Sequence, residues 1–141
     1  MNENEEEFHG AKVAVFIADK LVVILRDDRA DIPYPNMWDF PGGGRERLET
    51  PEETAIRETR EEIGLSLEAE QLVGRSDYFT ERGNRLFFFA VHLSAEASHS
   101  LALGDEGQRL ELVSAEEFLA LPDAIDFMKS KLSSYLRMQT G

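Results

Sequence analysis

The segment from Trp38 to Gly64 constrains the fold of this chain more than any other part of the sequence. It begins with a short, largely apolar run, continues through a proline and three glycines, and ends in a stretch with helical character. Proline followed by glycines indicates a strand end that enters a flexible loop. Thr50 is then a good N-cap, Pro51 suits the first helical position, and Glu53 completes a capping box. The pattern therefore predicts a strand, a loop and a helix that ends at the final glycine.

The predicted helix has two chemically different faces. Ile56, Thr59 and Ile63 are spaced to face a core on one side. Three carboxylates share the other side: Glu58, Glu61 and Glu62. Like charges at such spacings destabilise a helix by about 0.2–0.5 kcal/mol per pair, and a divalent cation would relieve that repulsion. Mg²⁺ prefers oxygen ligands and is usually held by carboxylates together with substrate phosphates. A solvated acidic face is the alternative interpretation.

A longer compound pattern favours the metal site over a solvated face. Its fixed positions are a glycine, five charged residues and a glycine–leucine pair: Gly43, Glu49, Arg57, Glu58, Glu61, Glu62, Gly64 and Leu65. Chance agreement at so many positions is improbable. The segment resembles the Nudix box, and the chain is similar to the Nudix hydrolases, which cleave nucleoside diphosphates linked to another moiety. Thr59 is the one departure from the commonest form, in which an aliphatic residue stands there.

The resemblance implies a role for most of the fixed positions of the box. It implies four metal-binding positions, the last through its main-chain carbonyl: Glu58, Glu61, Glu62 and Gly43. It also implies Mg²⁺ or Mn²⁺ as the cofactor. Arg57 is expected to pair with Glu49 and to orient the ligands, as outer-shell partners of metal sites do. A charge that only favours the start of the helix is the alternative interpretation of Glu49.

A further carboxylate is suggested by the resemblance. In some Nudix enzymes a glutamate from a loop before a late strand enters the metal site, sometimes as the base that activates water. Here Glu106 precedes a strand-like run over residues 109–113, within a segment similar to that of the MutT enzymes. Asp-Glu-Gly is also ordinary loop composition, so a loop residue without catalytic function is the alternative.

The expected reaction is hydrolysis of a phosphoanhydride bond in a nucleoside triphosphate or another nucleoside-diphosphate-linked small molecule. Metal ions clamp phosphate oxygens and acidify water in such reactions. The chain has no cysteine, and His9, His92 and His99 form no convincing arrangement with a serine nucleophile. A nucleotide-binding sensor or partner module without turnover is the alternative function. The complete set of box carboxylates favours the hydrolase.

Length and composition predict one α/β domain. With 141 residues and 42% hydrophobic content, the chain is large enough for a proper core. We expect an acidic, disordered tail over residues 1–9 and a single Nudix domain over residues 10–141. No apolar run approaches the roughly 20 residues needed to cross a membrane. The acidic start is unlike a signal peptide, so a cytoplasmic protein with no membrane partner is expected.

The net charge narrows the class of partner. A formal charge of −13 argues against binding of a nucleic-acid polymer, which requires clustered lysine and arginine. A small nucleotide needs only local basic groups and a metal. Four arginines are candidates to meet phosphates: Arg45, Arg47, Arg82 and Arg85. Many Nudix proteins form homodimers, but no stretch of this sequence identifies an interface.

The remaining segments predict the scaffold. A β-hairpin is expected over residues 12–25, a long loop near the mouth of the site over 27–37, and extended segments over 71–75, 76–80 and 86–93. Ser114 and Glu117 have capping-box spacing for a short helix, and a last helix is expected from about Pro122 to Leu136. Together they predict an α/β/α sandwich around a mixed β-sheet, the fold that the resemblance also implies.

The sequence identifies the substrate less closely than it identifies the metal site and the reaction. Nudix enzymes that recognise an oxidised guanine use an asparagine near the start of the final helix, and residues 121–126 contain none. The ADP-ribose branch often has a proline where Thr80-Glu81 stand here. A nucleoside triphosphate or a related nucleotide is therefore expected by default.

Overall fold

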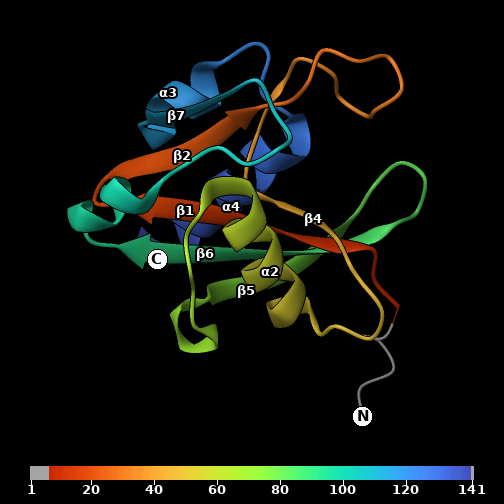
Figure 1. Cartoon of the computed structure of the whole chain (residues 1–141), viewed down its shortest axis with the longest axis horizontal. Helices are drawn as coiled ribbons and strands as arrows, with labels where there is room; N and C mark the ends of the chain where they lie inside the picture. The colour runs from red at the N-terminus through yellow and green to blue at the C-terminus, as the bar shows by residue number, and fades with distance from the viewer. Residues whose placement is uncertain (1–6, 141) are drawn as a thin grey trace.

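The computed structural model describes residues 7–140 and has a mixed β-sheet with helices on both faces (Figure 1). Within these residues the sheet has seven strands: β1 (Gly10–Ile17), β2 (Lys20–Leu25), β3 (Trp38–Asp39), β4 (Gly42–Gly44), β5 (Val73–Phe79), β6 (Arg85–Leu93) and β7 (Arg109–Val113). The helices are α2 (Pro51–Ile63), α3 (Ala115–Ala120) and α4 (Asp126–Thr140), with short 3₁₀ turns η1 (Ala69–Gln71) and η2 (Ala95–Ser100). The predicted α/β fold is confirmed.

The sheet order is β3-β2-β1-β6-β5, with β4 beside β1 and β7 beside β2. The central pair, β1 and β6, runs parallel from Gly10 opposite Leu86 to Ile17 opposite Leu93. The other paired strands are antiparallel. The sheet is therefore mixed, as predicted.

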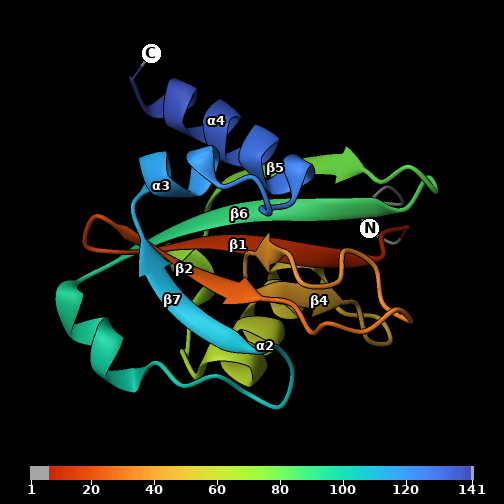
Figure 2. The same cartoon turned by 90° about the horizontal axis from the view of Figure 1, so that it is seen from above.

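The two faces of the sheet carry separate cores. Figure 2 shows α2 on one side and α3 and α4 on the other. Ala55 and Ile63 of α2 are fully buried against alternate residues of β1, β2 and β6. On the opposite face, Phe118 of α3 and Leu132 of α4 are also fully buried. Because successive side chains of a strand point to opposite faces, each central strand contributes to both cores.

Helix α2 forms as its local sequence predicts. The Thr50 side chain accepts a hydrogen bond from the Glu53 N–H at 3.1 Å, and the Glu53 carboxylate accepts one from the Thr50 N–H at 2.9 Å. Gly64 ends the helix in the left-handed conformation, with φ of 77°, which glycine adopts without steric cost. Thr59 is fully buried, and its hydroxyl oxygen has no hydrogen-bond partner within the described residues.

The prediction of a flexible glycine loop after Pro41 is wrong. Gly42–Gly44 form β4, which pairs antiparallel with Gly10–Lys12. The strands approach so closely that a Cβ at Gly10 would overlap the Gly43 carbonyl, and one at Gly42 would overlap the Ala11 carbonyl. The glycines therefore permit a close backbone pairing rather than a mobile turn.

The last helix begins at Asp126, four residues after the predicted start. The backbone before it pairs with β3: the Trp38 N–H donates to the Asp123 carbonyl at 2.8 Å, and the Ile125 N–H donates to the Trp38 carbonyl at 3.1 Å. The Asp123 carbonyl and the Ile125 N–H therefore bond with β3 instead of with a first helical turn at these residues. The helix also continues to Thr140, beyond the predicted end at Leu136.

The remaining predictions differ from the structure in detail. Residues 26–37 contain no helix or strand, as expected. The two extended segments over 71–80 are one strand, β5, with an irregularity between Val73 and Ser76. Phe8 is 5% exposed and belongs to the core, and the His9 N–H donates to the Arg85 carbonyl at 2.7 Å. The expected tail is therefore too long at its inner end, and its residues 1–6 lie outside the described residues.

Among residues 7–140, no helix has both the length and the apolar character needed to cross a bilayer.

Candidate functional site

Arg57 is the centre of a hydrogen-bonded cluster of carboxylates on α2 and the preceding loop. Its Nε and Nη2 atoms donate to the two carboxylate oxygens of Glu49 at 2.7 and 3.0 Å. Its Nη1 atom donates to Glu58 and Glu61, both at 3.1 Å. Nη2 also donates to the Gly44 carbonyl at 2.7 Å. The expected contact between Arg57 and Glu49 is thus present, and it is bidentate.

Glu49 is held as a carboxylate by several donors. The hydrogen bonds from Arg57 are the largest cause that lowers the pKa of Glu49, to about 2. The Glu46 N–H at 2.9 Å and the Thr54 hydroxyl at 3.0 Å lower it further, while burial opposes them. The same pair raises the pKa of the Arg57 guanidinium. Glu49 is therefore more than a charge at the start of the helix, because it fixes the position of Arg57.

Glu58 lies against the backbone of β4. Its side chain is 14% exposed, and a Cβ added to Gly43 would stand 2.6 Å from the Glu58 carboxyl carbon. Burial raises the pKa of Glu58, and the hydrogen bond from Arg57 opposes that shift. The absence of a side chain at position 43 therefore leaves room for the Glu58 carboxylate beside the main chain of the glycine strand.

Glu62 is the most deeply placed of the three helix carboxylates. One of its oxygens accepts a hydrogen bond from the Gly42 N–H at 2.9 Å. Burial raises the pKa of Glu62 to about 7, although the charge of Lys12 acts in the opposite direction. Glu61, in contrast, has a half-exposed side chain. The carboxylates therefore occupy environments that range from buried to solvated along one helix face.

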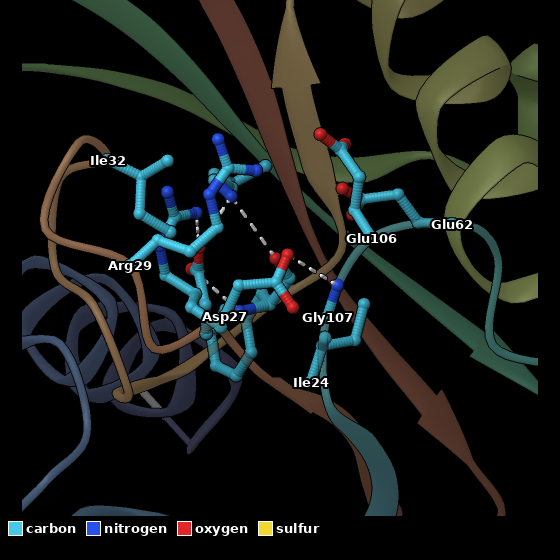
Figure 3. A pocket seen from close by; sticks show the side chains of 11 residues that line it. Ile24, Asp27, Arg29, Ile32, Glu62, Glu106 and Gly107 are labelled. Carbon is cyan, nitrogen blue, oxygen red and sulfur yellow. Dashed lines mark hydrogen bonds and ion pairs between the residues drawn. The ribbon is translucent and has the colours of Figure 1, made fainter.

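Glu62 and Glu106 line the same cavity, of about 90 Å³. Figure 3 shows these two side chains on one wall of it, with Arg29 and Asp27 nearby. The loop that carries Glu106 lies just before β7, far from α2 in sequence. It lies against the end of α2 in space, where the Gly104 N–H donates to the Glu62 carbonyl at 2.9 Å. The fold thus brings a carboxylate outside the box to the box helix.

Hydrogen bonds brace the Glu106 loop against the loop over residues 26–37. The Gly107 N–H donates to the Asp27 carboxylate at 3.2 Å. The Gln108 side chain donates to the Arg26 carbonyl at 2.7 Å and to the Asn36 side-chain oxygen at 2.8 Å. The position of Glu106 is therefore coupled to a loop that lines a second, larger cavity.

The second cavity has a volume of about 590 Å³ and adjoins the first. Its walls come from the 26–37 loop, the turn between β5 and β6, and the start of α4; they include Tyr34, Tyr78, Arg82, Asn84 and Phe127. Arg82 is the one of the four candidate phosphate-binding arginines that lines it. Arg45 lies over the Phe8 ring at 4.4 Å, and Arg85 donates to Asp77 at 2.8 Å.

Three charged residues that the sequence analysis did not select lie on the wall that the two cavities share. The Lys12 ammonium is 2.7 Å from a carboxylate oxygen of Asp39, and the Arg26 guanidinium is 3.2 Å from the same oxygen. All three residues line both cavities. A lysine inside the apolar run of β1 was the available signal, because a charge in a central strand is rarely buried without a partner.

The oxygen-only donor set suits a hard divalent cation, and Gly43 leaves space beside Glu58. Between residues 7 and 140, however, no three His, Asp or Glu side chains are grouped as they would be around a metal ion. Here Arg57 donates to Glu58 and Glu61, and Glu62 accepts from the Gly42 N–H. The metal-ligand set therefore stays a prediction.

A family model of the NUDIX domain matches residues 8–134. The chain belongs to this family. The NUDIX match covers the described sheet, α2, α3 and most of α4, so the sequence resemblance is confirmed over nearly the whole chain.

Individual relatives agree with the NUDIX assignment. The chain is 36% identical over 86 residues to an 8-oxo-dGTP diphosphatase of Escherichia coli. This match covers 60% of this chain and 64% of that protein. It is 28% identical over 96 residues to the mouse diphosphoinositol polyphosphate phosphohydrolase 3-alpha, covering 68% of this chain. That match spans 55% of the mouse protein's length.

Solved structures show the same fold. A MutT protein from Methanosarcina mazei superposes with a TM-score of 0.76 at 16% identity, covering 97% of this chain and 99% of that one. The predicted Nudix-type sandwich is thereby confirmed.

Substitution of Gly43 by alanine is expected to disturb the site without unfolding the NUDIX domain. The new Cβ would displace the Glu58 carboxylate, which is the end of a flexible side chain, so the domain's melting temperature should change little. A misplacement of about 1 Å in a reactive site can cost about 100-fold in rate, so a loss of about 10- to 100-fold is expected in any hydrolytic activity of the domain. Gly44→Ala is the matched control, because its Cβ would meet only the His9 carbonyl, at 3.8 Å. Equal activity of the two variants would contradict the placement of Glu58.

Acid is expected to weaken the Glu49–Arg57 pair. The pKa of Glu49 is about 2 in the folded state against an ordinary value of 4.5, so the pair stabilises the fold fully above pH 4.5 and loses this effect as the pH falls toward 2. At neutral pH, Glu49→Gln should cost about 1–3 kcal/mol of unfolding free energy. Urea denaturation of both proteins at several pH values would measure this difference, which should shrink between pH 4.5 and pH 2. A difference that is independent of pH would exclude the carboxylate as its source.

Proposed function

We propose that this NUDIX-domain protein hydrolyses a phosphoanhydride bond in a nucleoside triphosphate or another nucleoside-diphosphate-linked small molecule, with Mg²⁺ or Mn²⁺. The observation that carries the proposal is the shared cavity of Glu62 and Glu106, which also contains cationic side chains and adjoins a larger cavity. Carboxylates suit metal ions, and cations suit phosphates. The names of the E. coli and mouse relatives, a diphosphatase and a phosphohydrolase, support the same chemistry.

In the proposed site, five positions would hold the metal, the last through its carbonyl: Glu58, Glu61, Glu62, Glu106 and Gly43. The bound metal would neutralise phosphate charge and acidify a water molecule. Arg57, fixed by Glu49, keeps the Glu58 and Glu61 carboxylates oriented toward one helix face. The Gly42 N–H orients Glu62. Glu106, at the cavity wall, is the proposed residue that accepts the proton of the attacking water.

The proposal includes the class of partner. A formal charge of −13 disfavours a nucleic-acid polymer and an anionic membrane surface, so the proposed substrate is a small nucleotide. The cytoplasm stays the predicted location. A homodimer stays a prediction, which sedimentation velocity measurements would test.

A nucleotide-binding module without turnover is the second candidate. It is favoured by the arrangement of Arg57, which donates to two of the carboxylates that would hold the metal, Glu58 and Glu61. Such a module would bind nucleotides and raise its melting temperature with them, but would release neither phosphate nor pyrophosphate.

A substrate panel tests the two candidates. Nucleoside triphosphates, ADP-ribose, dinucleotides and nucleotide sugars would be incubated with Mg²⁺ or Mn²⁺, and the release of phosphate and pyrophosphate would be followed separately. Metal-dependent release from at least one compound is expected. Stabilisation by nucleotides without any release would overturn the hydrolase and support the binding module. The product pattern would also identify the bond that is cleaved.

A further inference from the structure

Lys12, Arg26 and Asp39 form an ionic cluster between the two cavities, in which the carboxylate is buried and the two cations are partly buried. Asp39 is 3% exposed, and the Lys12 side chain is 12% exposed. One oxygen of Asp39 accepts from both cations, and its other oxygen accepts from the Phe40 N–H at 2.8 Å. Asp39 therefore has its hydrogen-bonding capacity largely occupied within the protein, and it holds two cationic side chains at the shared wall.

The cluster has an excess of positive charge and spare donors. Two cations face one carboxylate within the cluster. Further negative charges that act on Lys12 include those of Glu62 and Glu58, which a divalent cation would balance in the proposed site. A lysine ammonium has three N–H donors; Asp39 at 2.7 Å and the Phe40 carbonyl at 3.3 Å account for two of them. A desolvated charge is costly unless it is paired, so the cluster is suited to an anion in the adjoining cavities.

The position of the cluster indicates which anion. On one side lies the cavity with the candidate metal ligands Glu62 and Glu106. On the other side lies the larger cavity, whose aromatic and aliphatic walls suit a nucleoside. In a substrate that occupies both cavities, the group that joins the nucleoside to the scissile bond lies beside the shared wall. In a nucleotide that group is a phosphate.

We propose that Lys12, held by Asp39 beside Arg26, binds the phosphate group that links the nucleoside to the scissile bond. This inference rests on the proposed function, because it assumes a substrate that spans both cavities. Lys12 then acts as a substrate-binding residue, and it selects compounds that carry an anion at this distance from the metal site. If Lys12 had a purely structural role and only neutralised Asp39, its removal would not selectively weaken binding of the phosphate-bearing compound.

The test measures binding of compounds that cannot be hydrolysed. The α,β-methylene analogues of ADP, GDP, CDP and UDP and their parent nucleosides would be titrated with Mg²⁺ by calorimetry into the wild type and Lys12→Met. Lys20→Met is the matched control, because Lys20 lies on the neighbouring strand with a half-exposed side chain, 3.8 Å from Glu117. The double variant Lys12→Met/Asp39→Asn is a control for misfolding. It removes the negative charge that Lys12→Met alone would leave without its lysine partner.

The wild type is expected to bind at least one methylene diphosphate more tightly than its parent nucleoside. Lys12→Met should weaken that diphosphate about 10- to 100-fold, as loss of a charge-assisted hydrogen bond predicts, and should leave the nucleoside unchanged. The double variant should show the same selective loss, and Lys20→Met none. Unchanged diphosphate binding, an equal loss for the nucleoside, or a wild type that does not prefer the diphosphate would each overturn the proposal. The titrations need no turnover, so a failure of the hydrolase proposal in the substrate panel is distinguishable from a failure of this one.

Discussion

Replacement of Glu62 by glutamine is expected to lower the rate of nucleotide hydrolysis by about two to three orders of magnitude while the protein stays folded. If Glu62 holds the metal as proposed, its loss removes several kcal/mol of transition-state stabilisation, and each 1.36 kcal/mol corresponds to about tenfold in rate. The fold should persist because the amide oxygen of glutamine is still able to accept the Gly42 hydrogen bond. Burial already disfavours the charge at this position, so the metal-free variant should melt at or above the wild-type temperature.

Steady-state kinetics with Mg²⁺, together with thermal melting, would measure both effects. Glu52→Gln is the control on the same helix, because Glu52 is 3.7 Å from Arg75 and lies outside both cavities. The control should retain full activity. Wild-type hydrolysis by Glu62→Gln would show that Glu62 is not a metal ligand in the reaction.

Replacement of Arg57 by methionine is expected to have the largest effect on stability. Arg57 is 15% exposed and donates to three glutamates and the Gly44 carbonyl. Removal of one partner from a largely buried ionic network leaves the others uncompensated, and a loss of about 3–5 kcal/mol of unfolding free energy is expected. Arg57→Lys should recover only part of it, because an ammonium group is unable to reproduce the bidentate contact with Glu49.

Chemical denaturation with and without Mg²⁺ would measure the effect of Arg57→Met. A divalent cation is expected to restore part of the lost stability, since it would neutralise Glu58 and Glu61 in place of the guanidinium. Arg60→Met is the matched control, as Arg60 is exposed on the same helix. If Arg57→Met were as stable as Arg60→Met, the guanidinium would not be what holds the carboxylate cluster together.

Local sequence signals predicted the elements that depend on local interactions. The capping boxes at Thr50 and Ser114 and the glycine after α2 involve residues within four positions of one another, so the chain specifies them before it folds. The start of α4 was misplaced because the backbone of residues 123–125 pairs with Trp38. That pairing is a tertiary contact that no local pattern reports. The glycine strand β4 was missed for the same reason, since it exists only against β1.

The candidate site also combines features that the sequence predicted with features that depend on tertiary contacts. The Arg57–Glu49 contact was expected from the resemblance, and the structure shows it as a bidentate pair. Glu106 was suggested only by resemblance, and the structure places it at the same cavity as Glu62. Lys12, Arg26 and Asp39 were not selected, because their contacts join β1, the residue after β2, and β3 across sequence separations of 27 and 13 residues. The cluster depends on strand order rather than on a motif.

The Trp38–Gly64 segment by itself determined the family, the amphipathic helix and the line of carboxylates on one of its faces, because helical periodicity and capping are local properties of the chain. Only the tertiary structure decided which charges meet those carboxylates. The pairing of β2 with β1 and β3 sets Lys12, Arg26 and Asp39 at the wall between two cavities, and the bracing of the Glu106 loop adds a carboxylate from outside the box. Electrostatic interactions depend on distance and burial, and these quantities exist only after the sheet has formed.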